Sequence, residues 1–135
     1  MPTITATYLG DLRVKCEHTA SKTELITDAP VDNHGRGQSF SPTDLCCTAL
    51  GTCALTIAAI KARELGKDLD GSSLEITKTM AADPRCIAKI EIIFHIPGSY
   101  TGEEKLALEN AATSCPVCLT LGPGTIQEFK FDWMD

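Results

Sequence analysis

The chain has few aromatic residues and little positive charge, and these shortages exclude some functions. Only 5% of its residues are aromatic, and its 12 basic residues stand against 18 acidic ones. Proteins that bind nucleic acids usually present clustered basic residues, often with aromatic residues among them. No such cluster is present, so we expect no nucleic-acid partner.

Long apolar segments and export signals are also missing. The longest uncharged stretch, residues 45–60, falls short of the roughly twenty apolar residues that a membrane-spanning helix needs. Residues 1–5 lack the charged start and apolar run of a secretory signal. We therefore expect a cytoplasmic protein that does not bind a membrane.

Cysteine, in contrast, is abundant, with seven residues. An odd number of cysteines cannot pair completely, and surplus thiols fit a reducing compartment best. The chain is long enough, at 135 residues, to form one hydrophobic core without disulfides or metal. We expect a single domain, 1–135, whose cysteines are packing residues, ligands or catalysts.

The order of the predicted elements is that of a mixed α+β domain. Three strands come first, and a long helix, a hairpin, a shorter helix and a last strand follow. The expected ranges are 4–8, 12–16 and 24–27 for the first strands, 41–66 for the long helix, 73–81 and 88–96 for the hairpin, 101–114 for the shorter helix and 126–133 for the last strand. We expect an exposed loop over residues 29–40, and a short helix restarting at Cys115-Pro116.

The two longer helices carry patterns that predict how they are buried. The first begins at Ser41, with Pro42 and Asp44 in its first turn. Its first four turns are apolar on every face, so we expect its own sheet on one side and a second subunit on the other. In the shorter helix, the expected buried stripe comprises Leu106, Ala107, Asn110 and Ala111.

Three cysteines lie in the long helix, where periodicity alone favours a structural role. Cys46 and Cys53 are on nearly the same face, and Cys47 points elsewhere. Among alanines and threonines they fit as small core residues. A reactive role for Cys53 depends on a second thiol site.

Cys115 and Cys118 form a Cys-Pro-Val-Cys run with the spacing of redox and zinc-binding pairs. With Pro116 at the first helical position, the helix N-terminus would face Cys115. We therefore expect a lowered pKa for Cys115 and a more covered Cys118. A thioredoxin-like pair normally follows an early strand, which makes that interpretation weak here.

Zinc binding is the structural alternative for this pair. A zinc site would need two further ligands, for which the candidates are other cysteines and His18, His34 and His95. Because only one Cys-x-x-Cys pair is present, we expect no metal and no other cofactor.

Two motifs stand in a fixed order along the chain. The first is Ser-Pro-Thr-Asp-Leu at 41–45 with Ala-Leu-Gly-Thr-Cys at 49–53, and the second is Ser-Cys-Pro-Val at 114–117. Together they resemble the OsmC/Ohr family of osmotically inducible and organic-hydroperoxide-resistance proteins, and the likeness spans nearly the whole chain. It implies the α+β OsmC-like fold, β-β-β-α-β-β-α-β, as an intertwined homodimer with active sites at the subunit interface.

By this resemblance, Cys53 would be the peroxidatic cysteine and Cys115 the resolving cysteine of a thiol peroxidase. The Cys53 thiolate would attack an organic hydroperoxide, and the resulting sulfenic acid would condense with Cys115. A small dithiol, lipoyl-type in the family, would reduce the disulfide. The implied role is defence against oxidative stress.

The chain departs from the family pattern near the first cysteine. Thr43 stands where well-characterised peroxidases of the family place a glutamate that pairs with an arginine. Asp44 points about 100° away around the helix and is the expected capping carboxylate. Arg36 is the best candidate for the arginine, with an ordinary surface arginine as the alternative. The second hypothesis is therefore a non-catalytic protein of the same fold that binds a small apolar or thiol-reactive ligand at the dimer interface.

Cys118 replaces the serine that commonly follows Cys-Pro-Val in this family. It is either a second resolving thiol or a small buried residue, and we favour the latter. Cys16, Cys47 and Cys86 have no partner that the sequence identifies, and we treat them as structural.

Overall fold

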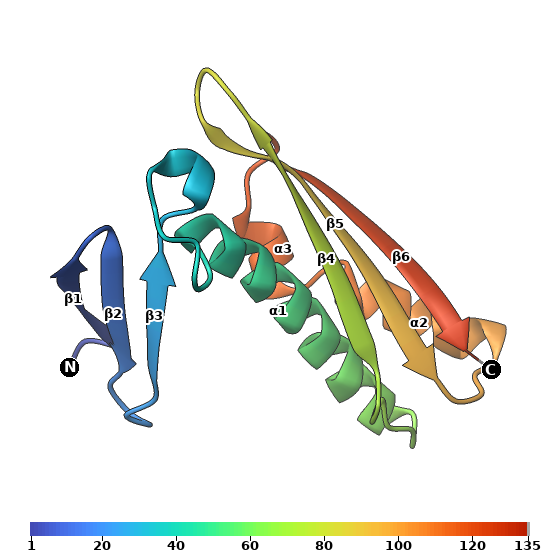
Figure 1. Cartoon of the computed structure of the whole chain (residues 1–135). Helices are drawn as coiled ribbons and strands as arrows, with labels where there is room; N and C mark the ends of the chain where they lie inside the picture. Colours follow the sequence, from blue (N-terminus) through green and yellow to red (C-terminus); the bar gives the residue numbers. More distant parts are fainter. Residues whose placement is uncertain (135) are drawn as a thin grey trace. The chain divides into compact units, whose positions relative to one another are not determined.

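The computed structural model describes residues 1–134, which form two compact units, Met1–Cys46 and the segment from Cys47 onward. Each unit contains a three-stranded sheet (Figure 1). The elements are β1 (Ile4–Gly10), β2 (Arg13–His18), β3 (Glu24–Asp28), η1 (Val31–Asn33), α1 (Pro42–Glu64), β4 (Ser73–Ala81), β5 (Cys86–Pro97), α2 (Gly102–Ala112), α3 (Pro116–Thr120) and β6 (Ile126–Met134). The predicted α+β class and element order are confirmed.

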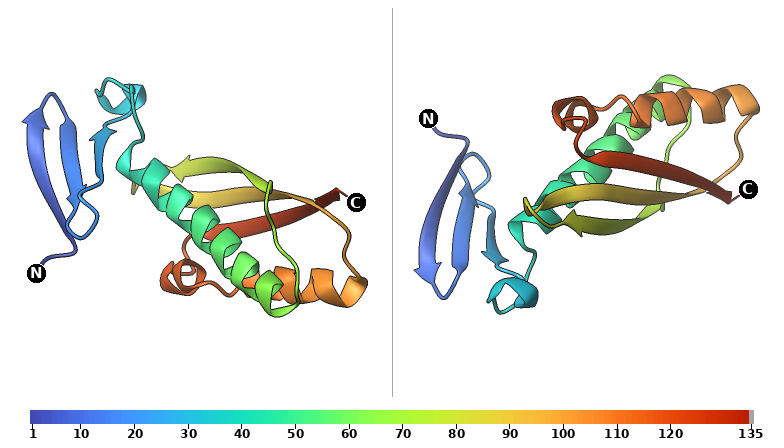
Figure 2. Two further views of the ribbon diagram at one scale, coloured as in Figure 1. Left: turned by 90° about the horizontal axis from the view of Figure 1, so that it is seen from below. Right: turned by 90° about the horizontal axis from the view of Figure 1, so that it is seen from above.

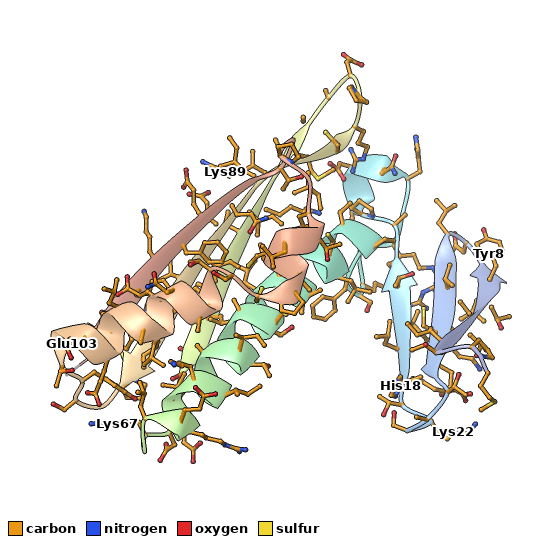
Figure 3. All side chains as sticks on the ribbon, turned by 180° about the vertical axis from the view of Figure 1, so that it is seen from behind. Tyr8, His18, Lys22, Lys67, Lys89 and Glu103 are labelled. Carbon is orange, nitrogen blue, oxygen red and sulfur yellow. The ribbon has the colours of Figure 1, made fainter. Side chains whose placement is uncertain are left out.

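The N-terminal unit is an antiparallel meander in which β2 pairs with both β1 and β3. The register puts one set of mainly apolar side chains on a common face: Ile4, Ala6, Tyr8, Val14, Cys16 and Leu25. Figure 3 labels Tyr8 near the β1–β2 end of the meander and His18 near the β2–β3 end. Tyr8 is 62% exposed and Leu25 is 45% exposed, so this apolar face is open.

A buried carboxylate anchors the loop after β3. Asp28 is fully buried and accepts hydrogen bonds from the Arg13 guanidinium at 2.6 Å and from the N–H of Gln38 at 3.0 Å. The hydrogen bond from Arg13 is the main reason that the pKa of Asp28 lies below its ordinary value, although burial opposes it. The carboxylate therefore stays ionised and fixes both ends of the loop.

Helix α1 begins and ends as the sequence predicts. At its start, Ser41 Oγ accepts the N–H of Asp44, and the Asp44 carboxylate accepts the N–H of Ser41. At its end, Gly66 has a φ of 72°, and the N–H of Lys67 donates to the carbonyl of Ala62. By length and composition alone α1 could also cross a membrane, but a helix buried in a protein core passes the same test.

In the C-terminal unit the helices cover one face of the β4–β5–β6 sheet (Figures 1 and 2). The central strand β5 is antiparallel to β4 and parallel to β6. Its alternate residues form one core with residues of α1 and α2; the members are Ile90, Ile92, Phe94 and Ile96 with Leu50, Ala54, Ala58 and Leu108. In Figure 3, Lys67 and Glu103 mark one end of this unit and Lys89 the other.

The opposite face of this sheet is polar. His95 lies between the buried Phe94 and Ile96 along β5, so its side chain points away from the helices. Its ring nitrogens are hydrogen-bonded to the carboxylates of Glu75 and Asp132. These bonds raise the pKa of His95, the one to Glu75 being the largest cause.

The buried stripe of α2 differs from the predicted one. The buried residues are Leu108 and Ala112, whereas Leu106 is 60% exposed and Asn110 is also exposed. Leu106 and Leu108 lie about 200° apart around the helix. Both faces of α2 therefore carry a leucine, and periodicity alone selected the wrong one.

Gly51 marks a close approach of α1 to β4. A Cβ at this position would lie 2.6 Å from Cδ1 of Ile76 and 3.2 Å from Cδ1 of Leu74. We expect Gly51→Val to lower the free energy of unfolding by about 1–3 kcal/mol, because overpacking displaces core side chains. Urea denaturation followed by circular dichroism measures this change.

The matched control is Gly102→Ala in the first turn of α2, where an added Cβ meets nothing within 4 Å. This variant should be at least as stable as the wild type, because alanine restricts the unfolded chain more than glycine does. If Gly51→Val were as stable as the wild type, the close packing of α1 on β4 would be wrong.

Candidate active site

Cys53 lies in the middle of α1 and is half-buried against the core of the C-terminal unit. The N–H of Val117 and the thiol of Cys115 lie close enough to its sulfur to act on the pKa of Cys53. The neighbouring Cys47 is 3% exposed and packs into the core. Cys53 is thus the cysteine of this helix that meets a second thiol.

Cys115 is the N-cap residue of α3 and is fully buried. Its sulfur accepts the N–H of Cys118 at 3.3 Å, which takes the place of an oxygen cap. Pro116 occupies the first turn of α3, as the sequence predicts. The cap fixes the Cys115 sulfur at the start of the helix, where it meets Cys53.

Cys118 adds a third sulfur to this site. Its Sγ lies 2.8 Å from Sγ of Cys115, and its thiol donates a hydrogen bond to the carbonyl of Ala112 at 3.5 Å. All three cysteines are free thiols. The three sulfurs therefore form a chain in which Cys115 contacts both Cys53 and Cys118.

Burial controls the acidity of this site. It raises the pKa of Cys53, and the hydrogen bond from Val117 opposes the rise only in part. Burial is also the main cause that raises the pKa of Cys115, with a further contribution from its hydrogen bond to Cys118. The N–H groups that face the sulfurs do not offset the loss of hydration.

Two predictions about the Cys-Pro-Val-Cys run are wrong. We expected the start of α3 to lower the pKa of Cys115, but α3 has only five residues and Cys115 is fully buried. The loss of hydration therefore raises the pKa of Cys115 more than the start of the helix lowers it. We also expected Cys118 to be the more covered thiol, whereas Cys118 is 8% exposed and Cys115 is not exposed at all.

The other residues singled out from the sequence belong to the N-terminal unit. The guanidinium of Arg36 pairs with the carboxylate of Asp11, and both side chains are largely exposed. The hydroxyl of Thr43 lies 3.1 Å from that of Ser41, and Asp44 caps α1 as expected. The site thus brings Cys53 and Cys115 together, and the role of Arg36 stays a prediction.

The sequence interpretation missed two contributors to the site, the N–H of Val117 and the thiol of Cys118. The Cys-x-x-Cys spacing did carry a signal for Cys118, because residues three apart lie one helical turn apart. For Val117 no signal existed, since a backbone N–H has no side-chain signature.

The candidate zinc ligands are distributed over both units. His18 and His34 belong to the N-terminal unit, and His95 is held by two carboxylates on the polar face of the second sheet. Within residues 1–134, no group of three or more His, Cys, Asp or Glu side chains is arranged to hold a metal ion.

Solved structures include a near relative of this chain. An osmotic stress induced and detoxification response protein, as its structure is described, from Psychrobacter arcticus is 43% identical and superposes with a TM-score of 0.94. The match covers 97% of this chain and 96% of that protein. The comparison with curated protein sequences gave no significant match.

More distant structures share the fold. An organic hydroperoxide resistance protein OsmC from Legionella pneumophila is 18% identical, with a TM-score of 0.72 over 96% of this chain and 94% of that one. An organic hydroperoxide resistance protein from Elizabethkingia anophelis with thiocyanate bound is 15% identical, with a TM-score of 0.74 over 98% and 96% of the two chains. The family model for OsmC-like proteins matches residues 35–129. This chain therefore belongs to the family of OsmC-like proteins.

Proposed function

We propose that this protein is a thiol peroxidase that reduces organic hydroperoxides through Cys53 and Cys115 in defence against oxidative stress. The observation that carries the proposal is the contact between these two thiols, which α1 and α3 bring together from distant parts of the sequence. Membership of the OsmC-like family supports it, because proteins of this fold include organic hydroperoxide resistance proteins.

The geometry fits a two-cysteine mechanism. The Cys53 thiolate attacks the distal oxygen of the hydroperoxide, the O–O bond breaks, and an alcohol leaves. Cys53 is then a sulfenic acid, and the Cys115 thiol beside it condenses to a disulfide with release of water. A small dithiol, of the lipoyl type, reduces the disulfide and returns both cysteines to thiols.

The mechanism needs a positive group near Cys53, because burial raises the pKa of this thiol. Arg36 is the proposed donor of that charge. Its ion pair with Asp11 is largely exposed, and exposed pairs contribute little stability. The guanidinium can therefore exchange Asp11 for another partner at small cost.

The proposal includes a homodimer with its active sites at the interface. Support comes from two surfaces, one on each unit, that expose apolar side chains. One is the meander face that carries Tyr8 and Leu25. The other is the side of α1 opposite the sheet, where Ile60 is 50% exposed and Thr52 and Thr56 are also exposed. A second copy of the chain would remove both from water.

The alternative function is binding of a small apolar or thiol-reactive ligand without catalysis. The raised pKa values of Cys53 and Cys115 favour it, because a protonated thiol is a poor nucleophile. Thr43, in the place of the family glutamate, favours it too. The reaction of the protein with peroxide separates the two functions.

Reduced protein treated with cumene hydroperoxide should lose two of its seven thiols, because one disulfide forms per chain. Titration with a chromogenic thiol reagent measures the loss. Cys53→Ser should lose no thiol under the same conditions. Cys86→Ser is the matched control, since Cys86 is exposed, and should lose two thiols like the wild type. Full retention of thiols by the wild type in excess peroxide would refute the peroxidase.

The role of Arg36 can be tested by the pH dependence of Cys53 oxidation, measured by quenched thiol counts. Burial raises the pKa of Cys53, so without a cation the rate should reach half its maximum above the ordinary thiol value of about 8.5. Arg36→Gln should shift the midpoint upward and slow the reaction at neutral pH by about tenfold for each pKa unit.

Lys130→Gln is the control for loss of a positive charge, because Lys130 is an exposed residue of β6 on the polar face of the second sheet. It should leave the midpoint close to that of the wild type. Identical profiles for the wild type and Arg36→Gln would exclude Arg36 as the activating cation, whatever the peroxidase activity.

The homodimer predicts a change of molecular mass when a charge enters the open face of the meander. Leu25→Asp should shift the protein from dimer to monomer in size-exclusion chromatography with light scattering, because a buried carboxylate opposes association. Thr7→Asp, on the opposite face of the meander, should remain a dimer. A wild-type protein of monomeric mass at micromolar concentration would contradict the proposal.

A further inference from the structure

The two-cysteine mechanism leaves one sulfur of the site unused. Cys118 Sγ lies 2.8 Å from Cys115 Sγ, and the N–H of Cys118 donates to the same sulfur. A disulfide bond is about 2.05 Å long, so a small movement joins the two atoms. Both cysteines belong to one turn at the start of α3, which keeps them adjacent.

The two thiols differ in their exposure. Cys115 is completely buried, whereas Cys118 is 8% exposed. The residues that follow Cys118 on α3 are open to solvent, and Leu119 is 77% exposed. A reductant that approaches α3 therefore reaches the sulfur of Cys118 before that of Cys115.

We infer that Cys118 is a third catalytic cysteine, which takes over the disulfide that Cys53 forms with Cys115. The inference rests on the proposed peroxidase function. The Cys118 thiolate attacks the Cys115 sulfur, the Cys53–Cys115 bond breaks, and the Cys115–Cys118 bond forms. Cys53 leaves as a thiolate and takes up the proton that Cys118 lost. One disulfide is exchanged for another, so no electrons are gained or lost.

The positions of the three sulfurs allow this exchange. The sulfur of Cys115 contacts both of the other sulfurs, and it exchanges Cys53 for Cys118 as its disulfide partner. Cys118 needs no rearrangement of the chain to reach it, since both lie in the same helical turn.

The exchange returns Cys53 to the thiol state and places the oxidised pair within one turn of α3. A small dithiol attacks the Cys118 sulfur, which belongs to the less buried cysteine of this pair, Cys115 leaves as a thiolate, and a mixed disulfide forms with Cys118. The second thiol of the reductant then attacks the reductant sulfur that is bonded to Cys118, and Cys118 is released as a thiol. The products are an oxidised cyclic dithiol and three free cysteines.

Peptide mapping distinguishes the two disulfides. Wild-type protein receives one equivalent of cumene hydroperoxide, is quenched in acid, alkylated with N-ethylmaleimide and digested with trypsin. Cys115 and Cys118 share the tryptic peptide 106–130, whereas Cys53 lies in peptide 37–61. We expect peptide 106–130 to be lighter by two hydrogens and Cys53 to be alkylated. In Cys118→Ser, peptides 37–61 and 106–130 should be joined.

A second measurement follows reduction of the oxidised protein by dithiothreitol. Cys118→Ser should form its disulfide as fast as the wild type. Dithiothreitol should then reduce it at a measurably different rate, because the less buried cysteine of its disulfide is Cys53 and no longer Cys118. Cys86→Ser should match the wild type in both steps. Normal disulfide formation in Cys118→Ser also shows that this variant is folded.

The outcomes separate the two proposals. If neither the wild type nor Cys118→Ser loses thiols to peroxide, the peroxidase itself is wrong. If both react but the wild type keeps peptides 37–61 and 106–130 joined and is reduced at the same rate as Cys118→Ser, the role of Cys118 is overturned while the peroxidase stands.

Discussion

The close packing of α1 on its sheet is the constraint on which the site depends. Gly51 and a row of fully buried alanines, Ala54, Ala58 and Ala62, let the helix lie against β4 and β5. Because small residues line most of this side of the helix, with Leu50 as the large exception, α1 lies close to the sheet and shares one core with α2 and α3. That arrangement brings the start of α3 to the middle of α1, where Cys53 is located.

The same packing sets a conflict between position and reactivity. The core holds the sulfurs of Cys53 and Cys115 in contact, but it also removes water that would stabilise their thiolates. A protein can resolve this conflict with a nearby cation, with backbone N–H groups or with a further thiol. The N–H of Val117 and the thiol of Cys118 are present within the same unit, and the cation is the part that Arg36 is proposed to supply.

Most of the fold could be predicted from the sequence because its signals are local. Ser41, Pro42 and Asp44 define the start of α1, and Gly66 defines its end. Alternation located the strands to within a few residues. The buried face of α2 could not be predicted, since Leu106 and Leu108 point in different directions and only the tertiary contacts select one of them.

The site was predictable to a different extent. The resemblance of the motifs paired Cys53 with Cys115, and the structure brings these residues into contact. The pKa values of the two thiols could not be predicted from the sequence. The motif indicates a helix N-terminus, which lowers a thiol pKa, whereas the burial that raises it depends on the packing of the whole core. The exposure of Cys118 relative to Cys115 was likewise set by how α3 docks, which no spacing encodes.

The buried carboxylate Asp28 and the sheet histidine His95 give the two units opposite responses to acid and base. The pKa of Asp28 is lowered, so its bond to Arg13 contributes stability above the unfolded value of about 3.9 and loses it as the pH falls through the lower folded value. The pKa of His95 is raised, so its bonds contribute fully below about 6.5 and are lost as the pH rises through the higher folded value. Both networks therefore contribute fully between about pH 3.9 and 6.5, and a rising pH, which ionises the buried thiols, weakens the contribution of His95 on the polar face of the second sheet.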